Sequence, residues 1–179
     1  MASSFLLSCA LLFMLSCVGA KGHLHVQYVK DECYDAGATY YDLCVSSLSS
    51  EPRISKAGFA DFPSFSMEIS LANATAIRWN LQSNLKTDDA ATKRCIVLCI
   101  KHFDVAISNI RNAISSFSFS IDPIKGTSAI SFLISAQEHV KICQEQLKTH
   151  GVLPALVPKV EISNHLIHTA YDLIMYAMI

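Results

Sequence analysis

Apolar residues recur at alternating steps of three and four in four long segments of the chain. This spacing places apolar side chains along one side of an α-helix, whereas a half-buried strand would need alternation at every second residue. We therefore expect an all-α protein, an up-down-up-down four-helix bundle preceded by a short N-terminal helical hairpin. The predicted stripes are Phe62, Phe65, Ile69, Ala72, Ala76 and Trp79; Ile96, Cys99, Phe103, Ala106, Ile110, Ala113 and Phe117; Ala129, Leu133, Ala136, Val140, Cys143 and Leu147; and Ser163, Leu166, Ala170, Leu173 and Ala177.

Residues that start and stop helices separate these segments. Asp61 and the Thr-Asp-Asp run at 87–89 are expected to open helices, because their side-chain oxygens can accept hydrogen bonds from first-turn amides. Gly151, with Lys148 and His150 before it, is expected to close the third helix. Pro158 suits the first turn of the last helix, where its missing N–H costs nothing.

Residues 1–20 have the pattern of a secretory signal peptide. An uncharged apolar run covers residues 5–18, and the small residues Gly19 and Ala20 follow where a signal peptidase cuts. A transmembrane anchor is the weaker alternative, because a spanning helix needs about twenty apolar residues. Cleavage near Ala20 would remove Cys9 and Cys17 and leave an exported chain.

The mature chain would then form a single domain over residues 21–179. Within it we expect the helical hairpin at 21–50, a connector at 51–60 and the four-helix bundle at 61–179. A hairpin this small cannot bury a core of its own, so a crosslink within it has a clear physical purpose.

Five cysteines remain after the leader, and an oxidising compartment favours disulfides among them. Four of them, Cys33, Cys44, Cys99 and Cys143, allow three pairings. Short separation favours Cys33–Cys44, and the matching inward faces of two predicted helices favour Cys99–Cys143. Cys95 then stays as an unpaired buried thiol, although an intermolecular disulfide or competition with Cys99 for Cys143 is also open.

Composition and motifs argue against catalysis and against nucleic-acid binding. The formal net charge is −1, and no Lys/Arg cluster exceeds Lys93-Arg94. The chain has no Gly-x-Ser-x-Gly elbow, no phosphate-binding glycine loop and no His-Glu-x-x-His pattern. We expect no catalytic residue, no cofactor and no metal. The single N-glycosylation sequon, Asn73-Ala74-Thr75, makes Asn73 a candidate glycosylation site.

The cysteine frame resembles the plant invertase and pectin methylesterase inhibitor family across the mature chain. The resemblance rests on Cys33-x10-Cys44-Val-x-x-Leu48, Cys99-x-x-x-Phe103-x-x-Ala106, and Ser135-Ala136 ahead of Cys143. Phe103 replaces the family's usual Tyr. The Ser-Ala run begins eight residues before Cys143, where the family commonly has nine. The segment 169–174 is similar to the family's last helix, although it is less rich in alanine.

The resemblance implies a hairpin and four-helix bundle with disulfides Cys33–Cys44 and Cys99–Cys143, and Cys95 as a fifth, unpaired cysteine. It implies a secreted, non-covalent inhibitor that occludes the active-site cleft of a cell-wall enzyme in the apoplast. The partner would be pectin methylesterase or a cell-wall or vacuolar invertase.

The choice of target enzyme stays open. Invertase inhibitors of the family often carry a Pro-Lys-Phe motif between the helices with the last two cysteines. Here Pro123 and Lys125 are the candidate contacts, with Ile124 inserted and no Phe after the lysine. Two alternatives to an enzyme inhibitor are a secreted carrier of an apolar ligand and another extracellular recognition protein.

Overall fold

The computed structural model describes residues 26–117 and 123–179, with side chains from residue 126 onward in the second range. The predicted leader, residues 1–20, lies outside the described residues. Every regular element within those two ranges is helical, which confirms the expected all-α class. None of the described helices is long and apolar enough to cross a membrane.

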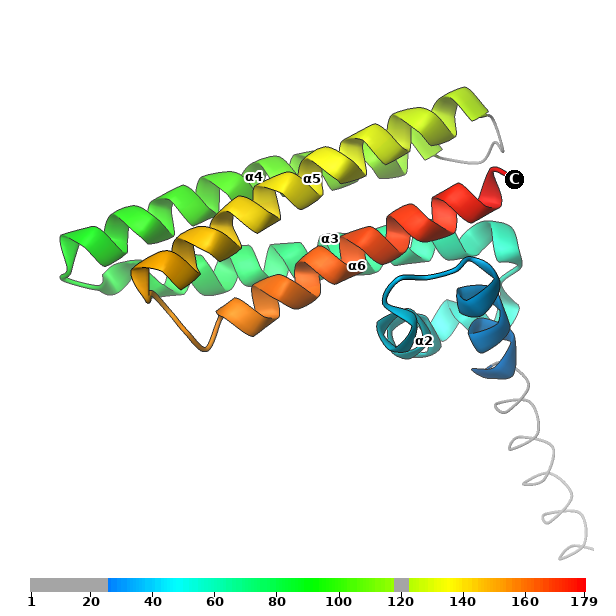
Figure 1. Cartoon of the computed structure of the whole chain (residues 1–179), viewed down its shortest axis with the longest axis horizontal. Coiled ribbons are helices and arrows are strands. Elements are labelled where there is room, and N and C mark those ends of the chain that lie inside the picture. The colour runs from blue at the N-terminus through cyan, green and yellow to red at the C-terminus, as the bar shows by residue number, and fades with distance from the viewer. Residues whose placement is uncertain (1–25, 118–122) are drawn as a thin grey trace, which may run out of the picture.

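Four long helices form the bundle: α3 (Phe62–Ser83), α4 (Ala90–Phe117), α5 (Pro123–His150) and α6 (Val157–Ala177). Successive helices run in opposite directions (Figure 1), and few residues separate each helix from the next along the chain. Each helix packs against two others, in the cyclic order α3, α4, α5, α6 and back to α3. Short links between long helices favour this arrangement of neighbours.

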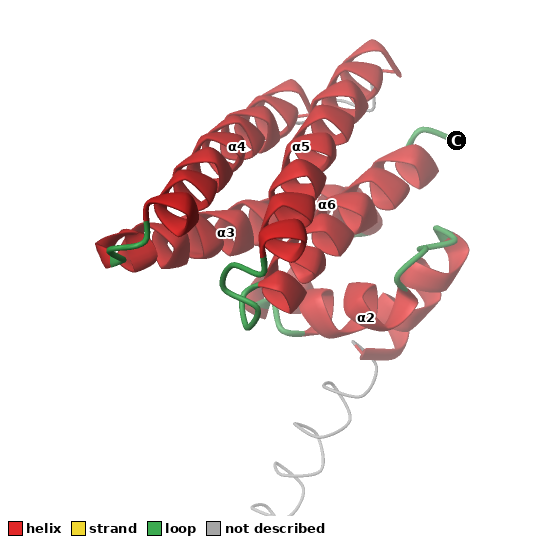
Figure 2. Ribbon diagram, turned by 60° about the vertical axis from the view of Figure 1, so that its left-hand side comes forward, coloured by secondary structure: helices red, strands yellow, loops and turns green. Residues whose placement is uncertain are grey.

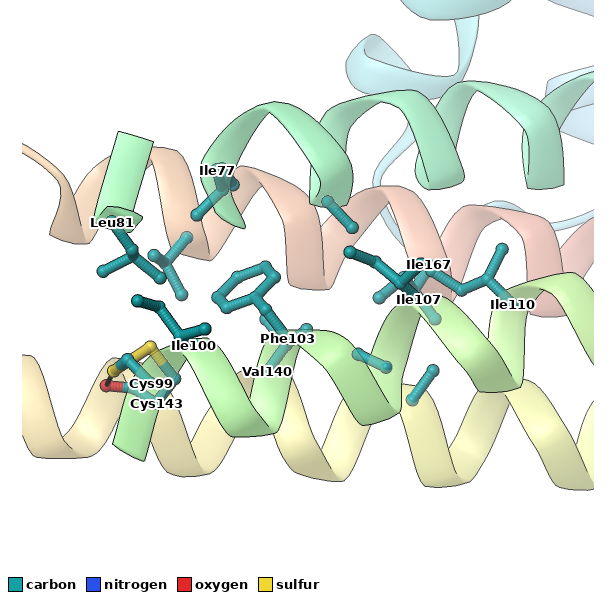
Figure 3. Packing of buried hydrophobic residues seen from close by; sticks show 14 of the residues in the cluster. Ile77, Leu81, Cys99, Ile100, Phe103, Ile107, Ile110, Val140, Cys143 and Ile167 are labelled. Atoms are coloured by element: carbon teal, nitrogen blue, oxygen red, sulfur yellow. Dashed lines mark hydrogen bonds between the residues drawn. A yellow bond between two sulfur atoms is a disulfide. The ribbon is translucent and has the colours of Figure 1, made fainter. Parts of the chain in front are cut away.

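The predicted apolar stripes of α4 and α5 form the centre of the core, as expected. Phe103, Val140 and Ile110 are completely buried, and Figure 3 shows Phe103 and Val140 between the helices. Each predicted stripe residue on these two helices is buried except Phe117, which is half-buried. In α6, Ser163, Leu166, Ala170 and Leu173 are buried, and Ala177 at the helix end is half-buried.

The predicted stripe of α3 is wrong in its C-terminal half. Trp79 is 64% exposed, and Ala72 and Ala76 are also exposed. The buried row instead comprises Phe62, Pro63, Ser66, Met67, Ser70, Ala74, Ile77 and Leu81. Two serines are tolerated in this row because a serine hydroxyl can bond within the helix. Ser70 Oγ donates to the carbonyl of Ser66 at 2.8 Å, which satisfies a buried hydroxyl.

Local capping explains the ends of α4 and α5. The carboxylate of Asp89 accepts a hydrogen bond from the backbone N–H of Thr92 at 2.8 Å, as an N-cap does. Gly151 has φ +62° and closes α5, and Val152 N–H donates to the carbonyl of Leu147 at 3.0 Å. Pro158 lies in the first turn of α6.

Asp61 differs from its predicted role. Its side chain makes no capping bond to α3. It accepts instead from the backbone N–H of Gly58 at 2.9 Å and stabilises the 3₁₀ turn η2 (Phe59–Asp61). The connector also contains a second 3₁₀ turn, η1 (Pro52–Lys56).

The N-terminal hairpin consists of a helix over residues 26–35 and α2 (Tyr41–Ser49). Gly37 makes the turn between them at φ +59°, where other residues would be strained. The hairpin packs against α3 and α6 near one end of the bundle (Figures 1 and 2). Its core is a second cluster of buried residues, namely Val29, Cys33, Ala38, Cys44, Leu48, Ile54, Phe62 and Leu173.

Candidate docking surface

Two disulfides hold the scaffold together. Cys33 and Cys44 are bonded within the hairpin, with Cα atoms 6.1 Å apart. Cys99 and Cys143 join α4 to α5, with Cα atoms 4.7 Å apart (Figure 3). Cys95 is a free thiol with 3% exposure, and burial raises its pKa. A buried, protonated thiol is a poor partner for an intermolecular disulfide, so the geometry favours the unpaired interpretation.

Polar side chains link α4 and α5 beyond the disulfide. His102 Nδ1 and His139 Nδ1 lie 2.9 Å apart, so one imidazole donates and the other accepts. Two turns further along α4, Asn109 Nδ2 donates to Ser135 Oγ at 3.0 Å. Burial, and then the neighbouring His139, lower the pKa of His102. In this part of the seam, one covalent bond and two hydrogen bonds between side chains therefore join α4 to α5.

Exposed apolar side chains flank this seam. Leu98 and Val105 are 45% and 41% exposed and lie seven residues apart on α4, on the same side as His102 between them. On α5, Ile142 is 39% exposed and follows His139 by three residues. We call these five residues, Leu98, His102, Val105, His139 and Ile142, the α4–α5 face. It is a partly exposed apolar surface on two helices, and the disulfide fixes the position of one helix relative to the other.

The surface of α4 that borders this face is cationic. Lys93, Arg94 and Lys101 are all exposed on it. Its single acidic residue, Asp104, accepts from Arg78 Nε of α3 at 2.9 Å and is neutralised there. A depression at the start of the helix is lined by Ala90, Lys93, Arg94, Val97 and Leu98. Apolar contacts bordered by exposed cations suit a partner whose surface carries carboxylates.

The predicted target contacts, Pro123 and Lys125, lie at the start of α5, and their side chains fall outside the described residues. Asn73, the predicted glycosylation site, lies in the middle of α3 and lines a depression between α3 and α6. The structure therefore does not bring Asn73 together with the α4–α5 face.

Sequence reasoning missed Leu98, Val105 and Ile142. Each lies beside a predicted stripe, and only the seven-residue spacing of Leu98 and Val105 hinted at a second apolar row. The pairing of His102 with His139 across the seam also left no motif in the sequence. Within 26–117 and 123–179, no group of three or more His, Cys, Asp or Glu side chains has the geometry to hold a metal ion.

Comparisons with known proteins agree with this architecture. A family model described as "Plant invertase/pectin methylesterase inhibitor" matches residues 27–173. No curated protein matches the sequence significantly. The fold is similar to the crystal structure of mutant form A of a pectin methylesterase inhibitor from Arabidopsis. That match has a TM-score of 0.67 at 16% identity and covers 84% of this chain and 95% of that one.

The family model covers the hairpin, both disulfides and most of α6, so the match spans more than one element of the fold. Members of this family are inhibitors rather than enzymes, which agrees with the absence of a catalytic motif in the sequence. The chain therefore belongs to the plant invertase/pectin methylesterase inhibitor family.

Proposed function

We propose that the mature chain is secreted to the cell wall and inhibits pectin methylesterase or an invertase there. It does so by non-covalent 1:1 docking of the α4–α5 face into the enzyme's active-site cleft. The observation that carries the proposal is the exposed apolar row of Leu98, Val105 and Ile142 beside the Cys99–Cys143 bridge. Membership of the inhibitor family supplies the class of partner.

Apolar burial would provide much of the affinity. Fully burying a large aliphatic side chain contributes about 1.5–3 kcal/mol, so each residue that is now about 40% exposed would add roughly 1 kcal/mol. A typical stable interface covers about 800 Å² on each partner. The α4–α5 face would then be the centre of a larger contact that includes the cationic residues of α4.

Rigidity supports this mode of inhibition. A surface that is already ordered loses less conformational entropy on binding. The disulfide and the His102–His139 hydrogen bond hold α4 against α5 before any partner arrives. An inhibitor built in this way needs no reaction with its target, which agrees with a family of non-enzymes.

Charge would set the orientation. The exposed Lys93, Arg94 and Lys101 can approach carboxylates at the rim of a cleft. A glycoside-hydrolysing invertase carries a pair of carboxylates in its cleft. In the invertase case, Lys125 at the start of α5 is the further candidate contact, and Lys125→Ala should weaken inhibition of invertase alone.

Export is part of the proposal. The apolar run at 5–18 and the small residues before Lys21 support cleavage after Ala20. Both disulfides are stable in an oxidising compartment. N-terminal sequencing of the protein recovered from the cell-wall space should begin at Lys21.

The deciding experiment is a parallel titration of the purified mature protein against pectin methylesterase and cell-wall invertase. Activity of one enzyme should fall linearly until one equivalent is added, as expected for tight 1:1 binding. Full activity of both enzymes at a large excess would remove the proposed function. Saturable displacement of a fluorescent lipid from the protein, in that case, would favour the carrier alternative.

A further inference from the structure

A groove runs between α3 and α6. One depression is lined by Asn73, Ala76, Ile77, Asn80, Lys159 and Ile162. A second depression continues it to the loop before α6, sharing Asn80 and Lys159 and adding Asn84, Leu153, Pro154, Ala155 and Leu156. The groove combines an apolar floor with carboxamides and one ammonium group, which can hydrogen-bond to hydroxyl and amide oxygens.

Asn73 is oriented with its two polar atoms in different surroundings. Its Oδ1 is buried and makes no hydrogen bond. Its Nδ2 makes no hydrogen bond to any described residue and is not fully buried. Asn73 also lines the depression, so its carboxamide borders the groove. Nδ2 is the atom to which an N-linked glycan is attached.

We propose that Asn73 carries an N-linked glycan whose first sugars lie in the groove between α3 and α6. The sequon Asn73-Ala74-Thr75 meets the requirement for transfer in a secreted chain. In that transfer a lipid-linked oligosaccharide diphosphate is the donor. Nδ2 bonds to the sugar's C1, the bond from C1 to the diphosphate oxygen breaks, and Nδ2 loses a proton.

The groove fits the polar and apolar sides of a sugar ring. Asn80 and Lys159 can donate to hydroxyl or acetamide oxygens, while Ala76 and Ile162 offer an apolar surface. Trp79 is 64% exposed and lies three residues after Ala76, hence beside it on the helix surface. An indole of this exposure can cover a sugar ring that extends from the groove.

The glycan would leave the α4–α5 face open. The groove lies between α3 and α6, whereas the α4–α5 face lies on the other two helices of the bundle. The glycan and the proposed inhibitory contact would occupy different surfaces, so glycosylation can be tested without measuring inhibition of any enzyme.

Occupancy is tested by expressing the full chain in plant cells and measuring the mass of the Asn73 peptide. We expect a glycan that peptide-N-glycosidase removes with conversion of Asn73 to Asp. Asn73→Gln and Thr75→Ala should abolish the modification. Thr75→Ser, which keeps the sequon, and Asn80→Gln, which lies in the groove outside the sequon, should retain it. An unmodified Asn73 in the wild-type protein would overturn the proposal.

The position of the glycan is tested by hydrogen exchange of the glycosylated protein against Asn73→Gln. We expect slower amide exchange in the glycoprotein at residues 73–80 of α3 and 157–163 of α6, and no change in α4 and α5. Equal exchange at residues 157–163 in the two proteins would mean that the glycan projects into solvent. This result would contradict the proposed position of the sugars in the groove. Inhibition of pectin methylesterase or invertase can fail independently of both results.

Discussion

Among single residues, Gly126 marks where the ends of α5 and α6 meet. A Cβ at this position would overlap Sδ of Met178 and lie 3.0 Å from its Cγ. Glycine is otherwise a poor helix residue, less favourable than alanine by about 1 kcal/mol. Gly126 therefore lowers the helix propensity of α5 but lets the C-terminal segment approach the helix closely.

The cost of this approach can be measured in a double-mutant cycle. Gly126→Ala should stabilise the protein more in a Met178→Ala background than in the wild type, because the shorter side chain leaves room for the new Cβ. The expected coupling is about 0.5–1 kcal/mol in urea unfolding. Additive effects of the two substitutions would contradict the contact between Gly126 and Met178.

His102 makes stability depend on pH. Its pKa is lowered by burial and by His139. In the unfolded chain, the imidazole of His102 takes up a proton near the ordinary histidine pKa of about 6.5. In the folded chain it takes up this proton only at lower pH. The free energy of unfolding should therefore fall as pH drops below about 6.5, until the lowered folded pKa is reached.

This dependence should weaken in His102→Gln. We expect a flatter dependence of the unfolding free energy between pH 7.5 and 5 than in the wild type. His150→Gln, which changes an exposed residue at the end of α5, is the matched control and should follow the wild type. Denaturant titrations at several pH values give the comparison, and an unchanged slope in His102→Gln would refute the assignment.

At the level of elements, sequence reasoning succeeded where one apolar row dominated the helix. In α4 and α5 large residues such as Phe103 and Leu133 lie in the predicted rows, and these rows are buried. The second row of α4, with Leu98 and Val105, is exposed. α3 carries two rows, and choosing between them requires tertiary information. The hairpin covers Phe65 and Ile69 at one end of α3. The predicted row is therefore partly buried at that end, whereas Trp79 is exposed to solvent at the other end of the helix.

Placement of the hairpin on the bundle could not be predicted. Thr39 N–H donates to Asp172 Oδ2 at 2.8 Å, although the two residues are 133 positions apart. His168 contacts both of them, Thr39 Oγ1 at 3.2 Å and Asp172 Oδ1 at 3.6 Å, and also contacts Gln137 of α5 at 3.1 Å. Single polar residues at such separations leave no periodic signal. The α4–α5 face was missed for a related reason, since half-exposed apolar residues are ordinary on any protein surface.

The disulfide between α4 and α5 should dominate the stability of the bundle. It joins residues 44 positions apart, and closing a loop of that length contributes about 4 kcal/mol in the chain-entropy model. The double variant Cys99→Ala and Cys143→Ala should lose roughly that amount in denaturant unfolding.

Cys95→Ala is the control for lost sulfur packing, because it removes a buried thiol on the same helix without removing a crosslink. It should cost much less than the double variant. Equal losses in the two proteins would indicate that the bridge contributes only through packing.

Asp172 should hold the hairpin to the bundle. Removing its carboxylate deletes the hydrogen bond to Thr39 and the contact with His168, a loss of about 1–2 kcal/mol in hairpin docking. Asp172→Ala should speed hydrogen exchange at residues 26–50 while leaving α4 and α5 unchanged. Asp42→Ala, an exposed carboxylate in the first turn of α2, should leave the hairpin protected. Exchange in Asp172→Ala equal to that of the wild type would show that apolar contacts alone seat the hairpin.

At the scale of the whole molecule, three parts of the surface can be distinguished. The hairpin covers one end of α3 and α6. The groove beside Asn73 occupies the remaining α3–α6 side. The α4–α5 face, free of both, is held rigid by the Cys99–Cys143 bridge. This division leaves the α4–α5 face available for the inhibitory contact that we propose.

The central claim is that this face makes the inhibitory contact, and a titration of surface variants against the inhibited enzyme tests it most directly. Leu98→Asp combined with Ile142→Asp should weaken inhibition by at least about tenfold, because it removes apolar contacts and introduces charge at the centre of the interface. Ile162→Asp, which alters an equally exposed isoleucine on the α3–α6 side, should inhibit as the wild type does. Wild-type inhibition by the double variant, with or without weakening in Ile162→Asp, would contradict the account.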